Sequence, residues 1–546
     1  MKYLKELKEF HVKKESDGFE LSELGDLAEL GGELSIYNLG NVATKEEARK
    51  AKLVSKGDLK ELRLVWGELD ASESSDGASE SSDALDGPTE SSGALDGTAE
   101  LSDVLDGLEP HPNLQSLGII NHGGSVGPHW LCDHMSIKML VSLHLEGVSW
   151  SILPPFGQLL HLRSLTLIHI STLVQIRPGV VGVTARSFTQ LKEIVLDSLS
   201  EFTEWVGTSN AHSFSMLERI VCRKCPNLYS LPFLQDCPAG SYNHLWKLEI
   251  TGCPKLLMPL MPHSSTLTEV TVSTSRTGDM VYANRNLYLT RYSRELAWHN
   301  MAGKVQSITF KAGSTIPWIV LQNLTSLKKL EIEGDSSQQS MASVSYLTSL
   351  TNLRIQDCKN FKVGGFNLLM ASNLKILAVH NIIEYYPRSV AADLLSELAV
   401  EITRSKKLLP PAAGSLLQLE RLNVDSISAV LVAPVCRLLA ATLKELVITC
   451  DREVENLTKD EEKALQLLTS LQELIFWRCR RLRSFPQGLH GLPCLRTLKA
   501  ISCRKIRSLP KKGIPTSLRE LSINDCSRKL HNQAKKLNQR NLSVSA

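Results

Sequence analysis

The chain has 546 residues, of which 42% are hydrophobic, 22% charged and only 5% aromatic, so apolar material for a folded core is ample. Its 61 Lys and Arg residues nearly balance its 58 Asp and Glu residues, and a formal net charge of +3 argues against a general nucleic-acid binder. This length would ordinarily suggest three or four compact domains, but the leucine pattern described below favours one repetitive structure.

The N-terminus gives no sign of export or of membrane insertion. The first residues, MKYLKELKEF, are charged and lack the apolar core of a secretory signal. The longest uncharged apolar stretch, 426–436, is far shorter than the ~20 residues that a spanning helix needs. We therefore expect a reducing, cytoplasmic compartment, in which the twelve cysteines are thiols rather than disulfides.

Residues 1–69 are expected to form the first repeats. Two weak strand-like units stand at 10–12 and 34–36. A Thr-x-x-Glu capping box opens residues 44–56 and predicts a helix there, on the convex side of the repeat.

Residues 70–106 form an acidic, low-complexity insert rich in Ser, Asp, Glu, Gly and Ala. No Lys or Arg occurs between Arg63 and Lys138. Such a segment cannot bury enough apolar surface to order itself, so we expect a solvated, disordered loop between two repeats. A tolerated expansion and a functional acidic tether are the two interpretations of this loop.

Residues 107–526 carry the strongest signal, an LxxLxL string that also occurs before the insert. Successive strings start mostly 21 to 29 residues apart, and about twenty repeats occur along the chain. Because its last leucines alternate with polar residues, each string predicts a short strand with one buried face. The strings begin at Leu59, Leu114, Leu140, Leu162, Leu191, Leu217, Leu245, Leu267, Val305, Leu327, Leu350, Leu374, Leu395, Leu419, Leu443, Leu471, Leu495 and Leu518.

Stacking of these units predicts the fold. A unit of ~24 residues cannot bury its leucines alone, whereas neighbouring units can share a continuous leucine core. The predicted fold is an α/β repeat solenoid, a leucine-rich-repeat horseshoe with short parallel strands on the concave face and irregular or helical convex segments. A second capping box, Thr458 with Glu461, predicts one such helix before Leu467.

Seven cysteines follow the predicted strands by two or three residues, where a side chain can cap the inner backbone turn. They are Cys225, Cys253, Cys358, Cys450, Cys479, Cys503 and Cys526. Cys222 and Cys225 also form a CxxC pair, which raises the alternative of a metal site. Zinc needs four ligands at matching spacing, and Cys222 occupies a buried strand position, so the structural interpretation is favoured.

Motifs of enzymes and cofactor sites are missing. The sequence has no P-loop, no GxGxxG after a strand, and no HExxH, GxSxG or protein-kinase set. His111, His122, His129 and His134 fall in a loop without ligand spacing. We therefore expect a protein that is not an enzyme, with no cofactor and no catalytic, cofactor-binding or metal-binding residues.

The C-terminal end is strongly basic. Seventeen Lys and Arg residues follow Ser470, against three Asp and Glu residues, and residues 527–546 are interpreted as a basic tail. This charge could bind nucleic acid, a phosphoinositide or an acidic protein surface. The arginines at 480–483 fall in a turn rather than on the concave sheet, which favours a solvated outer face.

Several blocks of the sequence resemble one family. LPPFGQLLHLRSLTL, at 153–167, resembles a signature of plant coiled-coil, nucleotide-binding, leucine-rich-repeat disease-resistance proteins. The block at 34–67 resembles the family's first repeats, and the block at 104–119 resembles the one after its variable acidic loop. The family's coiled-coil and nucleotide-binding portions would precede Met1, so the resemblance assigns no nucleotide site to this chain.

This resemblance implies a protein-recognition module of an innate immune receptor. Its concave sheet would sense a pathogen effector or a guarded host protein, and its N-terminal repeats would restrain the receptor's nucleotide-binding domain. The expected partners are therefore a protein ligand and that domain, with no nucleic acid and no membrane span. The alternatives are a truncated receptor fragment without signalling output and a leucine-rich-repeat substrate adaptor of a ubiquitin ligase.

The last repeats offer the best candidate for partner contact. An Ile and a Trp side by side on a free strand face are residue types that anchor protein interfaces. The alternative is that the Trp only packs on its neighbours on the next strand. The predicted partner-binding residues share the free face of three consecutive strands and are Glu473, Ile475, Trp477, Lys499, Ile501, Ser522 and Asn524.

Deleting residues 72–100 is expected to leave the free energy of unfolding almost unchanged, because loop length enters it only logarithmically. Chemical denaturation of the deletion variant and of the full chain measures the difference. In the full chain, limited proteolysis should cut first within this segment while the flanking repeats stay associated. Protection of the segment in the isolated protein would contradict the prediction.

Overall fold

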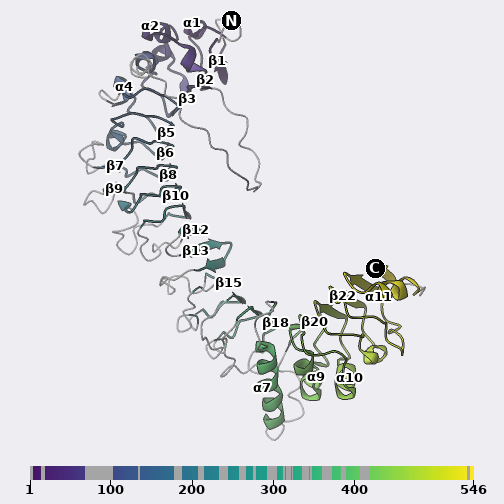
Figure 1. Cartoon of the computed structure of the whole chain (residues 1–546). Helices are drawn as coiled ribbons and strands as arrows, with labels where there is room; N and C mark the ends of the chain where they lie inside the picture. The colour runs from purple at the N-terminus through teal and green to yellow at the C-terminus, as the bar shows by residue number, and fades with distance from the viewer. Residues whose placement is uncertain are drawn as a thin grey trace, which may run out of the picture. The chain divides into compact units, whose positions relative to one another are not determined.

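The computed structural model divides into two compact units, Met1–Arg276 and Thr277–Ala546, and each is considered by itself (Figure 1). The predicted acidic insert lies outside the described residues except for its last four, 103–106. The structure describes residues 4–13, 19–67, 103–132, 136–177, 187–206, 214–232, 244–256, 266–274, 278–291, 304–311, 314, 321, 324–334, 344, 347–358, 372–382, 389–405, 418–537 and 542–545.

The first unit is a stack of short strands, one from each repeat. Neighbouring strands are parallel, and from β3 to β8 they pair residue for residue, so that corresponding leucines lie side by side. A small second sheet joins β7 (Gln175–Ile176) to β9 (Glu204–Trp205). The main strands are β1 (Glu9–His11), β2 (Gly32–Tyr37), β3 (Leu59–Val65), β4 (Ser116–Ile120), β5 (Ser142–Glu146), β6 (Ser164–Ile168), β8 (Glu193–Asp197), β10 (Arg219–Arg223), β11 (Lys247–Thr251) and β12 (Glu269–Thr274).

Burial alternates along each strand and separates a core side from a second side, hereafter the free face. In β5, Leu143 and Leu145 are completely buried, whereas Ser142, His144 and Glu146 are half-buried on the free face. The same alternation recurs in β6, β8 and β11. The strand prediction from LxxLxL is confirmed for every such string of this unit, and for the two weak units before them.

Short helices connect some of these strands, namely α1 (Leu21–Gly25), α2 (Lys45–Arg49) and α4 (His129–Cys132). Thr44 caps α2 as predicted, since its hydroxyl accepts a hydrogen bond from the Glu47 backbone N–H at 3.2 Å. The helix is shorter than the predicted 44–56. It stops before Lys52, which adopts a left-handed conformation with φ of 50°.

The end of the predicted insert is ordered. Residues 103–107 are helical, and Val104 and Leu105 are buried in the core. The indole N–H of Trp130 donates a hydrogen bond to the Leu105 carbonyl at 3.3 Å. The prediction of a disordered loop is therefore wrong for 103–106, because this apolar pair packs into the repeat.

The second unit repeats the same arrangement, and each strand from β14 to β24 is the parallel neighbour of the next. Its strands are β13 (Gly278–Ala283), β14 (Asn286–Thr290), β15 (Ser307–Lys311), β16 (Lys329–Glu333), β17 (Asn352–Gln356), β18 (Ile376–His380), β19 (Arg421–Val424), β20 (Glu445–Thr449), β21 (Glu473–Trp477), β22 (Thr497–Ile501), β23 (Glu520–Asn524) and β24 (Ser543–Ser545).

A hairpin that the sequence analysis missed opens this unit. β13 and β14 are antiparallel and are joined by Asn284 and Arg285, both with positive φ, 50° and 66°. Two such residues in succession suit a tight hairpin turn, and Asn tolerates the conformation better than most residues. Leu287 and Leu289 of β14 are buried, as alternate residues are in the repeat strands.

One predicted strand is a helix. The string at Leu395 lies within α7 (Val390–Ser405), and β18 pairs directly with β19. Ala391, Leu394 and Leu398 are also buried, which is the spacing of a helix face rather than the two-residue spacing of a strand. The prediction was therefore wrong at this string.

Further helices accompany the second unit, and the predicted capping box is confirmed at α10 (Lys459–Gln466). There, the Thr458 hydroxyl accepts from the Glu461 N–H at 3.3 Å, and Glu461 Oε2 accepts from the Thr458 N–H at 2.7 Å. α7 packs against α8 (Ile427–Val430) and α9 (Ala433–Leu439), and α9 packs against α10 (Figure 1).

The predicted C-terminal tail contains regular structure. Within residues 527–546, α11 (Arg528–Lys535) has a Ser527 cap, and β24 adds a last parallel strand beside β23. In the described part of the chain, the helices are all too short or too polar to cross a membrane.

The register predicts opposite effects for two neighbouring residues of β17. Leu353 is completely buried, so Leu353→Ala is expected to lower the free energy of unfolding by ~2–5 kcal/mol. Arg354 lies exposed on the free face, and Arg354→Ala is expected to change that energy by less than ~0.5 kcal/mol. Urea denaturation of both variants measures the difference. Equal destabilisation would contradict the register.

Candidate functional site

The predicted partner-binding residues lie together on the free face of β21, β22 and β23. Along β21, Glu473, Ile475 and Trp477 are half-buried and alternate with Leu474 and Phe476, which are buried. This alternation follows from strand geometry. It gives the β21 residues the orientation that the sequence predicted.

The next two strands extend this surface. Strand pairing places Lys499 of β22 beside Ile475 of β21, and Ile501 beside Trp477. Ser522 and Asn524 of β23 follow in the same register. Asn524 is exposed, whereas Ser522 is only 7% exposed and contributes little surface of its own. These seven residues are hereafter the C-terminal patch.

The charged members of the C-terminal patch are paired with each other. Lys499 Nζ lies 2.9 Å from a carboxylate oxygen of Glu473 and 3.8 Å from one of Glu520. The hydrogen bond that Lys499 donates to Glu473 raises the pKa of Lys499. Because these charges neutralise one another, the apolar side chains are what distinguishes the patch.

Trp477 has an intramolecular partner that the sequence analysis did not anticipate. The Arg478 guanidinium lies 5.1 Å from the centre of the Trp477 ring, within the range of a cation–π contact. Thr449, its register partner on β20, is completely buried. The Trp477 indole thus has the buried Thr449 on the β20 side and Ile501 on the β22 side, with the Arg478 guanidinium close to its ring.

Ion pairs between neighbouring strands neutralise much of the remaining free face. In the first unit, Arg223 pairs with Glu249 at 2.5 Å, and this hydrogen bond raises the pKa of Arg223 and lowers that of Glu249. In the second unit, Arg421 pairs with Glu445 at 2.5 Å. Such pairs add little stability at a surface. Within the described strands, they neutralise charges that a partner would otherwise meet.

A hollow in the free face of the second unit was not predicted. It measures about 340 Å³ and forms where the small Ala378 stands between longer side chains of β17 and β19. Arg354, Glu331, Arg421 and Asn423 are among the residues that line it. The sequence signal for this hollow was a single small residue, Ala378, at the central free-face position of its strand. Only the stacking of the strands shows that no side chain of the described residues fills the space above it.

The first unit has a comparable but more polar hollow of about 240 Å³. Gly118, which pairs with Arg63 on one side and His144 on the other, lines it together with these two residues and Ser142. The imidazole of His144 lies 3.0 Å from Glu146, and this hydrogen bond lowers the pKa of Glu146. A Cβ at Gly118 would lie 3.3 Å from the Arg63 side chain, so a larger residue here would crowd the hollow.

Two exposed apolar residues stand opposite each other on the hairpin. Val281 of β13 is 36% exposed and pairs with Tyr288 of β14, which is 43% exposed. The alternating string around the Asn-Arg turn, MVYANRNLYL, could have predicted this pair.

Thiols form a ladder behind the strands, as predicted for six of the seven cysteines. Cys479 Sγ donates to the Ile448 carbonyl of the previous repeat at 3.5 Å, and Cys503 Sγ donates to the Phe476 carbonyl at 3.4 Å. Cys225, Cys253, Cys358 and Cys526 make equivalent contacts.

Cys450 does not belong to this ladder. Cys450 stands one residue before the capping position and has a left-handed backbone, with φ of 59°. Asp451 occupies the capping position instead. Asp451 accepts from the backbone N–H of Ile427 at 2.7 Å and of Val454 at 2.9 Å. The predicted role of Cys450 was therefore wrong by one residue.

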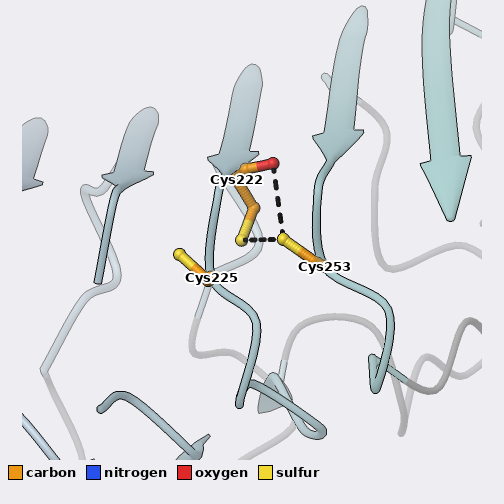
Figure 2. A group of neighbouring side chains, drawn as sticks. All are labelled: Cys222, Cys225 and Cys253. Carbon is orange, nitrogen blue, oxygen red and sulfur yellow. Dashed lines mark hydrogen bonds between the residues drawn. The ribbon is translucent and has the colours of Figure 1, made fainter. Parts of the chain in front are cut away.

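Three thiols meet in the core of the first unit (Figure 2). Cys222, Cys225 and Cys253 are completely buried, and their sulfur atoms all lie within 4.8 Å of one another. Cys222 Sγ is 3.5 Å from Cys253 Sγ, and Cys253 Sγ is also 3.8 Å from the Cys222 carbonyl. Hydrogen bonds with Cys225 and Cys253, together with burial, raise the pKa of Cys222 well above its usual value.

This trio offers a metal only three ligands. A closed zinc site needs four, and in the described part of the chain no other ligating residue joins the group. Cys225 and Cys253 also make the carbonyl contacts that ladder cysteines make elsewhere without a third thiol nearby. The ladder contacts of Cys225 and Cys253, together with the core position of Cys222, therefore explain why the three thiols lie together.

His380, at the end of β18, is a buried polar residue of the second unit. It is 2% exposed, and neither ring nitrogen has a hydrogen-bond partner among the described residues. Burial, reinforced by Arg354 and opposed by Asp357, lowers the pKa of His380 to about 4.

Parallel one-strand repeats with a leucine core and a thiol ladder define a leucine-rich-repeat solenoid. Residues 21–170 match the family model described as R13L1/DRL21 leucine-rich repeats. Disease resistance protein RGA2 of Solanum bulbocastanum is 28% identical over 249 residues, which cover 43% of this chain and 23% of that protein.

Two proteins of Arabidopsis thaliana named as disease resistance proteins are similar over longer stretches. The RPP13-like protein 1 is 26% identical over 375 residues, covering 64% of this chain and 29% of that protein. The other is 24% identical over 528 residues, covering 94% of this chain and 33% of that protein. The resemblance to the leucine-rich-repeat region of plant disease-resistance proteins is thus confirmed. The chain spans 23–33% of the length of these relatives.

Replacing His380 tests the cost of its burial. Because its folded pKa lies below the ordinary 6.5, the unfolded chain binds the proton more tightly, and stability is lost as pH falls from about 6.5 towards 4. His380→Phe should therefore lose about 2 kcal/mol less free energy of unfolding than the natural chain between pH 7 and pH 5. Urea denaturation at both pH values measures this. Identical losses in the two proteins would contradict the assigned environment.

Proposed function

We propose that this chain is the protein-recognition region of a plant innate immune receptor. Its similarity to plant disease-resistance proteins supports a role in defence recognition. In this proposal the free face of the repeats senses a pathogen effector or a guarded host protein. The receptor acts in the cytoplasm, and the N-terminal repeats hold its nucleotide-binding domain inactive until recognition occurs.

The observation that carries the proposal is the apolar centre of the C-terminal patch. Ile475, Trp477 and Ile501 stand on adjacent strands of a face whose charges are otherwise largely paired. Partly exposed aromatic and aliphatic side chains surrounded by polar groups are the usual anchors of protein interfaces.

Replacing Trp477 in a receptor that carries these repeats tests the proposal. Trp477→Ala should abolish or strongly weaken co-precipitation of the recognised protein and the defence response, while the melting temperature of the isolated repeats stays within a few degrees. Trp246→Ala is the matched control, since Trp246 is 39% exposed and lies outside the patch. If recognition survives in Trp477→Ala while the protein melts earlier, Trp477 is structural.

A further inference from the structure

A second hollow of the second unit lies at the carboxyl ends of its strands, outside the C-terminal patch. It measures about 290 Å³ and is lined by Ile382 after β18, Cys450 and Arg452 after β20, and Arg478, Arg480 and Arg481 after β21. Four of these six lining residues are arginines. The sequence predicts a turn for the β21 arginines, and the fold brings them to one hollow with Arg452.

The turn after β21 explains why the arginines converge. Cys479 and Leu482 are completely buried, and the Cys479 thiol is tied to the Ile448 carbonyl of the previous repeat. With these two positions fixed in the core, the intervening residues Arg480 and Arg481 remain exposed. Arg478 joins them from the left-handed position before Cys479, with φ of 52°.

Two of these arginines, Arg478 and Arg481, are not balanced by a carboxylate as others nearby are. Arg483 lies 3.0 Å from Glu455, and Arg504 lies 3.0 Å from Asp525, both outside the hollow. Among the described residues, neither Arg478 nor Arg481 has a carboxylate within 4 Å.

The carboxylates close to the hollow are engaged by other donors. Asp357 accepts from the Ile382 N–H at 2.6 Å, and Asp425 accepts from the Asn381 N–H at 2.9 Å. Burial raises the pKa of the Cys450 thiol, with Arg452 and Arg478 lowering it and these two carboxylates raising it. Both signs of charge therefore reach the hollow, and the guanidinium groups of Arg478 and Arg481 are the ones without a carboxylate partner among the described residues.

We propose that this hollow binds a compact soluble anion that carries two or more phosphate groups. A guanidinium presents a planar fork of N–H donors that matches phosphate oxygens two at a time. Several such forks around one cavity repel each other until an anion is bound. The volume is close to that of a small-ligand pocket and suits a compact anion rather than an extended polymer. The site goes beyond protein recognition by the C-terminal patch.

Calorimetric titration of the full chain with pyrophosphate, at constant ionic strength, tests this site. Arg478→Gln/Arg481→Gln should raise the dissociation constant at least about tenfold, because charge-assisted contacts from two arginines are lost. Arg496→Gln/Arg528→Gln is the matched control, since it removes the same charge from two exposed arginines outside the hollow. It should change the constant less than about twofold. Circular dichroism should show unchanged folding in both, and the single Arg481→Gln variant serves if the first double variant misfolds.

Three results would overturn the proposal. The first is no pyrophosphate binding by the natural chain. The second is equal weakening in both double variants, or tighter binding of a single-stranded oligonucleotide that both weaken alike, which would indicate general surface charge. The third is binding only to vesicles that contain a phosphatidylinositol bisphosphate, which would place the phosphate groups on a membrane. Selective loss in the Arg478/Arg481 variant supports the proposal.

Discussion

Burial of a leucine row between neighbouring repeats is the constraint on which the rest of the structure depends. A five-residue strand such as β21 buries only two of its own side chains, Leu474 and Phe476, so no repeat can form a core alone. Stacking turns these pairs into a continuous core. The backbone beyond the strand end must then be satisfied within the core, and thiols such as Cys479 do this by donating to the carbonyl of the previous repeat.

The same constraint creates the surfaces to which we assign function. Because alternate side chains must face the core, those between them are forced onto the free face, whatever their chemistry. Among the described residues, many charges there are paired between strands, as Arg421 is with Glu445. Features that break this pairing therefore stand out: the apolar centre around Trp477 and the gap above Ala378 on the free face, and Arg478 and Arg481 in the turn after β21.

The strands could be predicted because the LxxLxL period encodes burial directly. The string at Leu395 failed since a short apolar run also fits a helix, and only the pairing of β18 with β19 excludes it from the sheet. Partner contact by the C-terminal patch stays a prediction, although its orientation is as expected. Convergence of side chains far apart in sequence could not be predicted. The Cys222–Cys253 contact and the Arg452–Arg481 hollow depend on which residues consecutive repeats bring into register.

Hydroxyl-radical footprinting of the intact chain, analysed residue by residue by mass spectrometry, tests the separation of core side and free face most directly. The account predicts oxidation of Trp477 and Ile475 and of the exposed Tyr288, with protection of Leu474 and Phe476 on the same strand as Trp477. Oxidation of Leu474 and Phe476 at rates similar to Trp477 would contradict the register and, with it, every surface assigned to the free face.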